Sequence, residues 1–243
     1  DSSLTGSPAA AAFSVTSNGT ANSVSAVRVS GNDVTLDLLT PLTSSTSAVP
    51  VTVSYTAPAG NALQDSSGLA VGSFSATPVA TVRWGTASVD TLNGTAASDY
   101  FVLSAGADVL TGAGGVDVYA WPQTTATGTP VPQTTIKDFG LKSGTGGLQG
   151  ASEADVLELG HLLVGYTSAN RGQFLQLNKD DAGKLVLHID HDGGTTFAPT
   201  ESVLFDNITV NSSNNLVVNN AATTYSMGNL LDQLLADAQL HVS

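Results

Sequence analysis

Residues 85–120 read GTASVDTLN, GTAASDYFV, LSAGADVLT and GAGGVDVYA, four consecutive units of nine residues. The sixth position of every unit is aspartate, and the eighth is a large apolar residue. Small residues fill most of the first four positions, as expected of a loop that turns tightly and points its carbonyl groups inward. A nine-residue period with these residues in fixed phase is typical of a parallel β-roll. The repeated aspartates are Asp90, Asp99, Asp108 and Asp117.

The period also predicts which aspartates face each other. Six residues of each unit would form a loop and three a short strand, so that two units complete one coil. Asp90 is then expected beside Asp108, and Asp99 beside Asp117. Carboxylates at short range repel each other unless a cation lies between them. Because Ca²⁺ takes oxygen ligands from carboxylates and backbone carbonyls, we predict that calcium is the cofactor.

The repeat resembles the RTX, or hemolysin-type, calcium-binding nonapeptide GGxGxDxUx, but it departs from that pattern. No unit has glycine at its second position, Leu103 replaces the first glycine of the third unit, and Ser88 and Ala97 replace fourth-position glycines. The better metal site is therefore expected in the later half, around Asp108 and Asp117. An ordinary β-domain with turns rich in Gly and Asp is the alternative. The glycines that favour the later half are Gly106, Gly112, Gly114 and Gly115.

The acidic composition of the chain argues against some classes of binding partner. The 243 residues include only 7 Lys and Arg against 20 Asp and Glu, for a formal net charge of −13. Such a chain repels phosphate backbones and anionic lipid, which argues against nucleic-acid binding. No run of 18 apolar residues occurs, so no membrane span is predicted. The absence of cysteine excludes disulfides and thiolate zinc sites.

Residues 1–82 show short runs of alternating apolar and polar residues, at 27–30, 34–38 and 51–55, separated by turn signals. This pattern predicts a β-sandwich of immunoglobulin-like size. The phrase VTVSYTAPAGNALQDSSG at 51–68 resembles the SwmB-type repeat, and the similarity extends over about residues 13–78. The resemblance implies an immunoglobulin-like module that recurs in very large bacterial surface proteins.

The segment after the nonapeptides contains the phrases TTIKDF at 134–139 and DVLELG at 155–160. These phrases resemble the segment that follows β-rolls in type I-secreted proteins. The resemblance implies that the segment caps the roll and that Asp138 and Asp155 add calcium ligands. The alternative is that Asp138 caps a turn and Asp155 caps a short helix.

A third candidate site is Asp190-His191-Asp192-Gly193-Gly194. Alternating carboxylates before glycines are how short calcium loops begin, so Asp190 and Asp192 are candidate metal ligands. The distal glutamate of an EF-hand is missing, because Glu201 falls too far along the chain. A β-hairpin turn with solvated acids is the alternative.

Residues 227–240 are the one helical pattern, because Leu230, Leu231, Leu234 and Leu235 recur at helical spacing. The resemblance implies an uncleaved type I secretion signal, and a helix docked on the domain is compatible with it. We find no His-Glu-x-x-His or Gly-x-Ser-x-Gly motif and predict no enzyme.

The sequence therefore predicts a mainly β chain in three parts. An immunoglobulin-like β-sandwich spans 1–82, a short parallel RTX β-roll spans 83–120, and a β-rich cap and secretion target region with a C-terminal amphipathic helix spans 121–243. The predicted function is a calcium-dependent folding and secretion module at the C-terminus of a large bacterial surface adhesin.

We expect the chain to be secreted and extracellular, at the cell surface. The predicted partners are calcium ions, a type I exporter and, through the full-length protein, a host or cell-surface ligand. A calcium-dependent sugar- or peptide-binding module, with its site at 190–194, and the tail of a secreted RTX enzyme are the alternatives.

Overall fold

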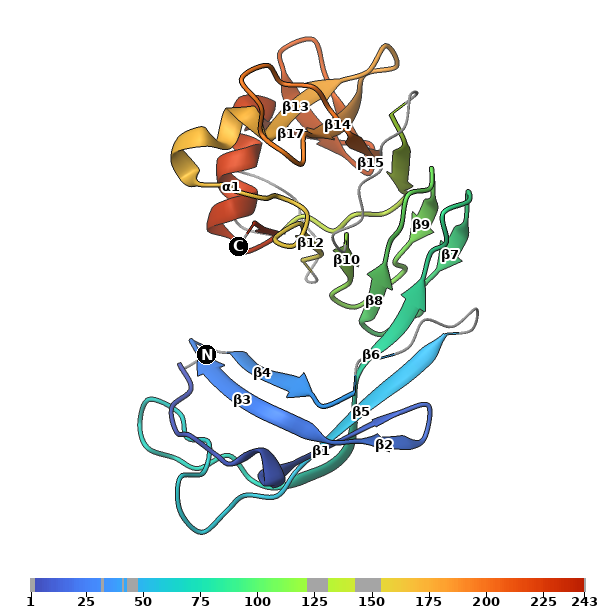
Figure 1. The fold of residues 1–243 in the computed structure, drawn as a ribbon. Coiled ribbons are helices and arrows are strands. Elements are labelled where there is room, and N and C mark those ends of the chain that lie inside the picture. Colours follow the sequence, from blue (N-terminus) through green and yellow to red (C-terminus); the bar gives the residue numbers. More distant parts are fainter. Residues whose placement is uncertain are drawn as a thin grey trace. The chain divides into compact units, whose positions relative to one another are not determined.

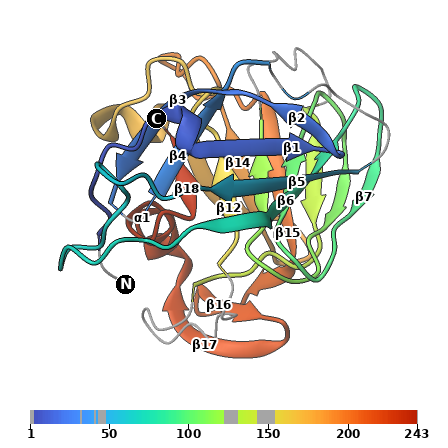
Figure 2. The ribbon, with the colours of Figure 1, turned by 90° about the horizontal axis from the view of Figure 1, so that it is seen from below.

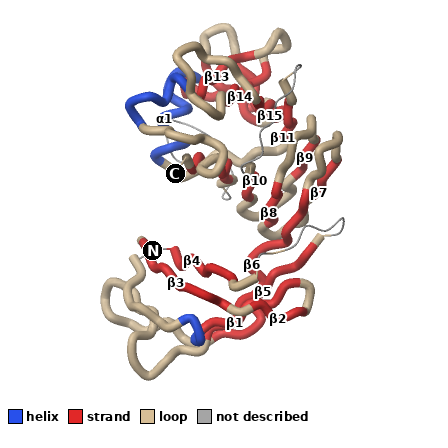
Figure 3. Tube along the Cα trace, in the orientation of Figure 1, coloured by secondary structure: helices blue, strands red, loops and turns tan. Residues whose placement is uncertain are grey.

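A computed structural model describes residues 3–31, 33–40, 42, 48–121, 131–142 and 154–242. The chain divides into two compact units, Asp1–Val82 and Arg83–Ser243, and each is described here by itself. Strands dominate both units, and one short α-helix lies near the C-terminus (Figure 3). The predicted mainly β class is therefore confirmed. No helix within the described ranges is long and apolar enough to cross a membrane.

The first unit contains two antiparallel sheets. In the larger sheet, β6 (Phe74–Trp84), β5 (Val49–Tyr55), β1 (Phe13–Ser17) and β2 (Thr20–Asn22) lie side by side in that order (Figure 2). The smaller sheet pairs β3 (Val24–Ser30) with β4 (Asp33–Leu38). A 3-10 helix, η1 (Ala10–Ala12), precedes β1.

Both sheets of the first unit contribute to one hydrophobic core. Phe13, Tyr55 and Leu63 are buried, and Val27 and Leu36 from the smaller sheet pack against them. The Phe13 and Tyr55 rings lie 4.9 Å apart between centroids, and the Tyr55 hydroxyl accepts the N–H of Leu63 at 2.9 Å. The apolar residues of each strand reach this core because successive side chains point to opposite faces. The immunoglobulin-like assignment stays a prediction.

The second unit begins with two ladders of short parallel strands, seen in Figure 1 in green. The first ladder pairs β7 (Thr91–Asn93) with β9 (Val109–Thr111), and the second pairs β8 (Asp99–Val102) with β10 (Val118–Ala120). Leu92 lies opposite Leu110, and Phe101 lies opposite Tyr119. Residues two nonapeptides apart are therefore neighbours, as the period predicts.

Both ladders continue past the nonapeptides. The first ladder adds β11 (Gln133–Ile136) and then β15 (Glu201–Val210), with Ile136 opposite Leu110 and Phe205 opposite Ile136. The second adds β12 (Val156–Glu158) and β18 (Leu240–His241), both in parallel register. The segment that the resemblance assigns to a cap thus contributes strands to the coils themselves.

The remaining strands of the second unit are antiparallel and extend the first ladder. They are β13 (Leu175–Lys179), β14 (Lys184–Ile189), β16 (Asn215–Val218) and β17 (Ala221–Ser226), paired in the order β13-β14-β15-β16-β17. The 3-10 helix η2 (Ser168–Gln173) precedes β13.

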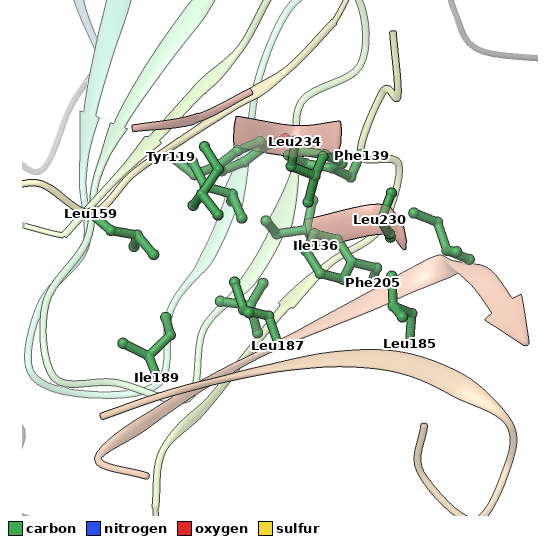
Figure 4. Close-up of a cluster of buried hydrophobic side chains, with 14 of the residues drawn as sticks. Tyr119, Ile136, Phe139, Leu159, Leu185, Leu187, Ile189, Phe205, Leu230 and Leu234 are labelled. Atoms are coloured by element: carbon green, nitrogen blue, oxygen red, sulfur yellow. The ribbon is translucent and has the colours of Figure 1, made fainter. Parts of the chain in front are cut away.

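One large hydrophobic core fills the second unit. The inward residues of the ladders, including Tyr119, Ile136 and Phe205, meet residues of the antiparallel strands such as Leu187 (Figure 4). Leu230 and Leu234 come from α1 (Leu230–Ala236), which follows η3 (Met227–Asn229), and are 1% and 2% exposed. The helix is shorter than the predicted range of 227–240, because the chain after Ala236 turns and Leu240 pairs with Leu157 in the strand β18.

Candidate metal centre

The repeated aspartates form a chain of side chain-to-backbone hydrogen bonds from one coil to the next. Asp108 Oδ1 accepts the N–H of Asp90 at 2.9 Å, and Asp117 Oδ1 accepts the N–H of Asp99 at 2.8 Å. Asp155 Oδ1 continues the series, because it accepts the N–H of Asp117 at 2.9 Å. Each carboxylate is therefore held against the aspartate of the preceding coil, and the structure brings together the pairs that the spacing predicts.

The carboxylates of Asp90 and Asp99 have hydrogen-bond donors that can compensate their charge without a metal ion. Asp90 Oδ2 accepts both the N–H and the hydroxyl of Thr86, at 2.6 and 2.8 Å. Thr95 makes the same two bonds to Asp99 Oδ2, at 2.7 and 2.9 Å. Arg83 Nε lies 3.0 Å from Asp99 Oδ1, so this buried carboxylate also has a positive charge beside it. The threonines occupy the second position of their units, where the RTX pattern has glycine.

Asp108 lies in a different environment. Its side chain is fully buried, and Oδ2 has no hydrogen-bond partner among the described residues. A Cβ atom built on Gly85 would lie 3.2 Å from Asp108 Oδ2 and 3.8 Å from Asp90 Oδ2, so these two oxygens lie near one another beside the Gly85 backbone. Burial raises the pKa of Asp108 to about 6; the hydrogen bond from Asp90 N–H opposes the shift, and the Asp90 charge adds to it.

Asp117 lies at the centre of an acidic cluster in the second ladder. The side chain is buried, and burial raises its pKa to about 7, with smaller contributions from the charges of Asp155, Asp99 and Asp138. The Tyr119 hydroxyl lies beside the same carboxylates and, within the described part of the chain, has no hydrogen-bond partner. Burial first, and then these four charges, raise the pKa of Tyr119.

Asp138 and Asp155 hold the loops around this cluster. Asp138 accepts the N–H groups of Gly112 and Ala113, both at 2.9 Å, while Asp155 Oδ2 accepts the N–H of Gly140 at 2.7 Å. These contacts are those of turn-capping residues, and they also place both carboxylates next to Asp117. The turn-capping alternative therefore describes Asp138, whereas Asp155 directly precedes the strand β12 and caps no helix; the ligand role of both residues stays a prediction.

The glycines of the later loops permit close approach between coils. A Cβ atom on Gly106 would contact the Ser88 carbonyl oxygen, and one on Gly112 would contact the Asp117 carboxylate. Gly115 has a φ of +92°, in the left-handed region that favours glycine, and lies against the backbone of Ser98. A larger residue at Gly106, Gly112 or Gly115 would therefore clash with the neighbouring coil or carboxylate, and the predicted place of these glycines in a metal site stays a prediction.

The third candidate site is a closed loop. Asp190 is buried, and its Oδ2 accepts the N–H of Ala198 at 2.7 Å while its Oδ1 accepts the N–H of Asp192 at 3.4 Å. The Asp192 side chain is exposed to solvent. Asp190 thus fixes the connection between the antiparallel strands β14 and β15, as in the hairpin alternative, but it is buried rather than solvated; only Asp192 is the solvated acid that this alternative expects.

Sequence reasoning missed Glu201, the first residue of β15. It is 2% exposed, and burial raises its pKa to about 8; the N–H groups of Ser202 and Thr134 oppose the shift, while the charge of Asp108 adds to it. The signal in the sequence was available, because Glu201 precedes Val203 and Phe205 in the alternation of an inward-facing strand.

The donor set fits a hard cation. Every candidate ligand is an oxygen, and the Ser88 carbonyl lies in the same tight corner as the Asp108 carboxylate, beside Gly106. Asp108 Oδ2 is a buried carboxylate oxygen that no donor in the described ranges satisfies. No three His, Asp or Glu side chains of the described residues are grouped closely enough to enclose a metal ion by themselves.

Comparison with known proteins supports part of the resemblance. Residues 1–60 match the family model SWM_repeat, described as a "Putative flagellar system-associated repeat". No curated protein and no solved structure matches the chain. The match lies within the first unit and covers most of the region that resembles the SwmB-type repeat. Residues 1–60 of the first unit are therefore similar to a repeat that is associated with the flagellar system.

Proposed function

We propose that the second unit is a calcium-dependent folding and secretion module of a large bacterial surface adhesin exported by a type I system. One observation carries the proposal: Asp108 is fully buried, and no group in the described residues satisfies its Oδ2 atom. An ionised carboxylate in this position is costly unless a cation or a proton compensates it.

Calcium would supply that compensation at neutral pH. Asp108, with the Asp90 carboxylate beside it, is the expected ligand pair of the first ladder. Asp117 is the expected ligand of the second ladder, where Asp138 and Asp155 surround it. When bound, Ca²⁺ would neutralise these charges and link successive coils through oxygen ligands.

Binding and folding would then form a single equilibrium. In a cytosol that is low in calcium, the acidic coils repel one another and the chain stays extended enough to pass through an exporter. Outside the cell, where calcium is millimolar, the same carboxylates are neutralised and the coils form. The net charge of −13 gives this repulsion its strength.

The packing of the C-terminal helix supports export of the chain before it binds calcium and folds. Leu230 and Leu234 belong to the core of the folded second unit, so the apolar stripe of the proposed secretion signal is covered after folding. An exporter could read that stripe only before the unit folds. Export before calcium binding is therefore the sequence that the packing favours. The repeat-like first unit supports the adhesin as the parent protein.

A calcium titration of the chelator-treated chain tests this function. Circular dichroism and calorimetry should show that the second unit gains structure and thermal stability with calcium, while the first unit does not change. Asp108→Ala and Asp117→Ala should weaken calcium binding, and the exposed Asp192→Ala should not. Equal folding of the second unit in excess chelator would reject the proposal.

A further inference from the structure

Tyr119 carries a hydroxyl at the nonapeptide position that is otherwise purely apolar. The eighth residues of the four units are Leu92, Phe101, Leu110 and Tyr119. In the second ladder, Tyr119 lies opposite Phe101 and stacks on it, with the ring centroids 5.0 Å apart and the ring planes inclined by 9°. Phe101 fills the same position in the preceding coil without a polar atom, so packing of the ring alone does not require the hydroxyl.

The hydroxyl of Tyr119 is buried without a partner. The residue is 0% exposed and lies in the core of the second unit, near Phe139 (Figure 4). No group in the described ranges forms a hydrogen bond with its oxygen. Leaving a buried hydroxyl unsatisfied costs about 1–3 kcal/mol, so a group that binds this oxygen would stabilise the fold.

Gly112 lies where this hydroxyl meets the Asp117 carboxylate. A Cβ atom built on Gly112 would contact Asp117 Oδ2 and would lie 2.6 Å from the hydroxyl oxygen of Tyr119, so both oxygens adjoin the same point. Asp117 directly precedes β10, and Tyr119 is the middle residue of that strand. The two side chains are two residues apart, which places them on the same face of extended backbone.

The other carboxylates of the second ladder already have protein donors. Asp99 accepts two hydrogen bonds from Thr95 and lies 3.0 Å from Arg83 Nε. Asp138 accepts two backbone N–H groups, and Asp155 accepts one N–H on each of its oxygens. A cation in the second ladder is therefore needed most at the point that Gly112 leaves open.

We propose that the Tyr119 hydroxyl is a calcium ligand of the second ladder, together with Asp117 Oδ2. The inference rests on the proposed calcium-dependent function and adds a ligand that lies on a strand of the roll rather than in a loop. A carboxylate and a neutral hydroxyl are oxygen donors that suit Ca²⁺ better than zinc or copper. The first ladder has leucine at the equivalent positions, so this ligand would belong to one ladder only.

Isothermal titration of the chelator-treated full chain with CaCl₂ at neutral pH tests the ligand in Tyr119→Phe. The variant keeps the ring that stacks on Phe101 and removes only the oxygen. It should lose one bound Ca²⁺ or bind one class of ion about tenfold more weakly than the wild type. A hydroxyl that takes no part in binding predicts the reverse, because its removal would stabilise the folded unit and leave calcium affinity equal or higher.

Tyr225→Phe is the matched control, since its hydroxyl donates to the Asn229 carbonyl at 3.1 Å. The two variants are compared by urea unfolding over the calcium concentrations at which the second unit is folded. Tyr225→Phe should lower the free energy of unfolding by the same amount throughout. In Tyr119→Phe the deficit should grow as calcium fills the site, because bound ligand stabilises the folded state in proportion to the logarithm of its saturation.

The inference is overturned if Tyr119→Phe binds as many ions as the wild type with equal or higher affinity. It is also overturned if the deficit of Tyr119→Phe is the same at every calcium concentration, as in the control. A wild-type chain that binds no calcium would refute the proposed function as well, so the two failures can be told apart.

Discussion

Replacing Asp117 by asparagine should stabilise the calcium-free chain and at the same time weaken its response to calcium. Asparagine is nearly isosteric, and its Oδ1 can still accept the Asp99 N–H that the wild-type carboxylate accepts at 2.8 Å. The substitution removes a negative charge from a side chain that is 2% exposed and surrounded by other aspartates. The charge of Asp117 destabilises the calcium-free fold and is stabilising only when a metal ion binds to it.

The magnitude follows from the pKa of the group. Burial raises the pKa of Asp117 from 3.8 to about 7. A tenfold change in an acid dissociation constant corresponds to about 1.4 kcal/mol, so ionised Asp117 destabilises the calcium-free fold by about 4 kcal/mol at neutral pH. The gain in Asp117→Asn is at most this large, because the new amide must also find partners for its N–H groups.

The sign also fixes the pH dependence. Because the pKa of Asp117 is higher in the folded chain than in the unfolded chain, this group does not lower the free energy of unfolding below pH 3.8. Above that pH the free energy of unfolding falls until the pH has passed about 7. In chelator, the wild type should therefore lose stability across this window. The advantage of Asp117→Asn should be absent below about pH 4 and should grow as the pH rises to neutrality.

Urea unfolding followed by circular dichroism, in chelator and in calcium, measures both effects. The control is Asp192→Asn, whose exposed side chain should change the free energy of unfolding by less than about 0.5 kcal/mol. The reasoning is refuted if Asp117→Asn is no more stable than the wild type in chelator at neutral pH, or if it gains as much from calcium as the wild type does.

Three further substitutions test the rest of the roll by urea unfolding in saturating calcium, where the account expects the second unit to be folded. Arg83→Gln should destabilise the second unit by about 3 kcal/mol, because Asp99 would stay buried without its cation; a change near zero would mean that the pair contributes nothing. Gly94→Ala should lower the free energy of unfolding by about 1–3 kcal/mol, because its Cβ would contact a backbone carbonyl of the next coil. The control is Gly60→Ala, which should have little effect because the space around Gly60 is open. Equal losses in the two variants would contradict the coil geometry. Leu110→Ala should cost about 2–5 kcal/mol, because the side chain is 0% exposed in the first ladder, and a loss below about 1 kcal/mol would argue against a packed interior.

The strand pairing of the nonapeptides could be predicted from the sequence because their period is regular. Once Asp and an apolar residue recur every nine positions, two units per coil place Leu92 opposite Leu110 and Phe101 opposite Tyr119. The mainly β class followed in the same way from alternation and turn signals. These features depend on local spacing, which a sequence displays directly.

The continuation of the ladders was harder to predict. In β11 a threonine, Thr134, stands where the repeat has aspartate, and β11, β12 and β18 do not follow one another at a regular spacing along the chain. The position of Glu201 depends on β15 pairing in parallel with β11, a contact between distant segments that no periodicity encodes.

The chemistry of the loops shows a similar limit. The sequence revealed that glycine is missing from the second position of each unit, but not what its replacements do. Thr86 and Thr95 supply an N–H and a hydroxyl to Asp90 and Asp99, so these substitutions satisfy carboxylates rather than merely weakening a site. The effect depends on a side-chain rotamer and a loop geometry, which only the three-dimensional structure contains.

Hydrogen-exchange mass spectrometry, with and without calcium, tests the central claim most directly because it reports on each segment separately. Calcium-dependent folding predicts that amides of β7–β10, at 91–120, are strongly protected with calcium and lose most of that protection in excess chelator. Peptides from β1 and β5 in the first unit should exchange equally in both conditions. Equal protection of 91–120 with and without calcium would contradict a fold that depends on the metal.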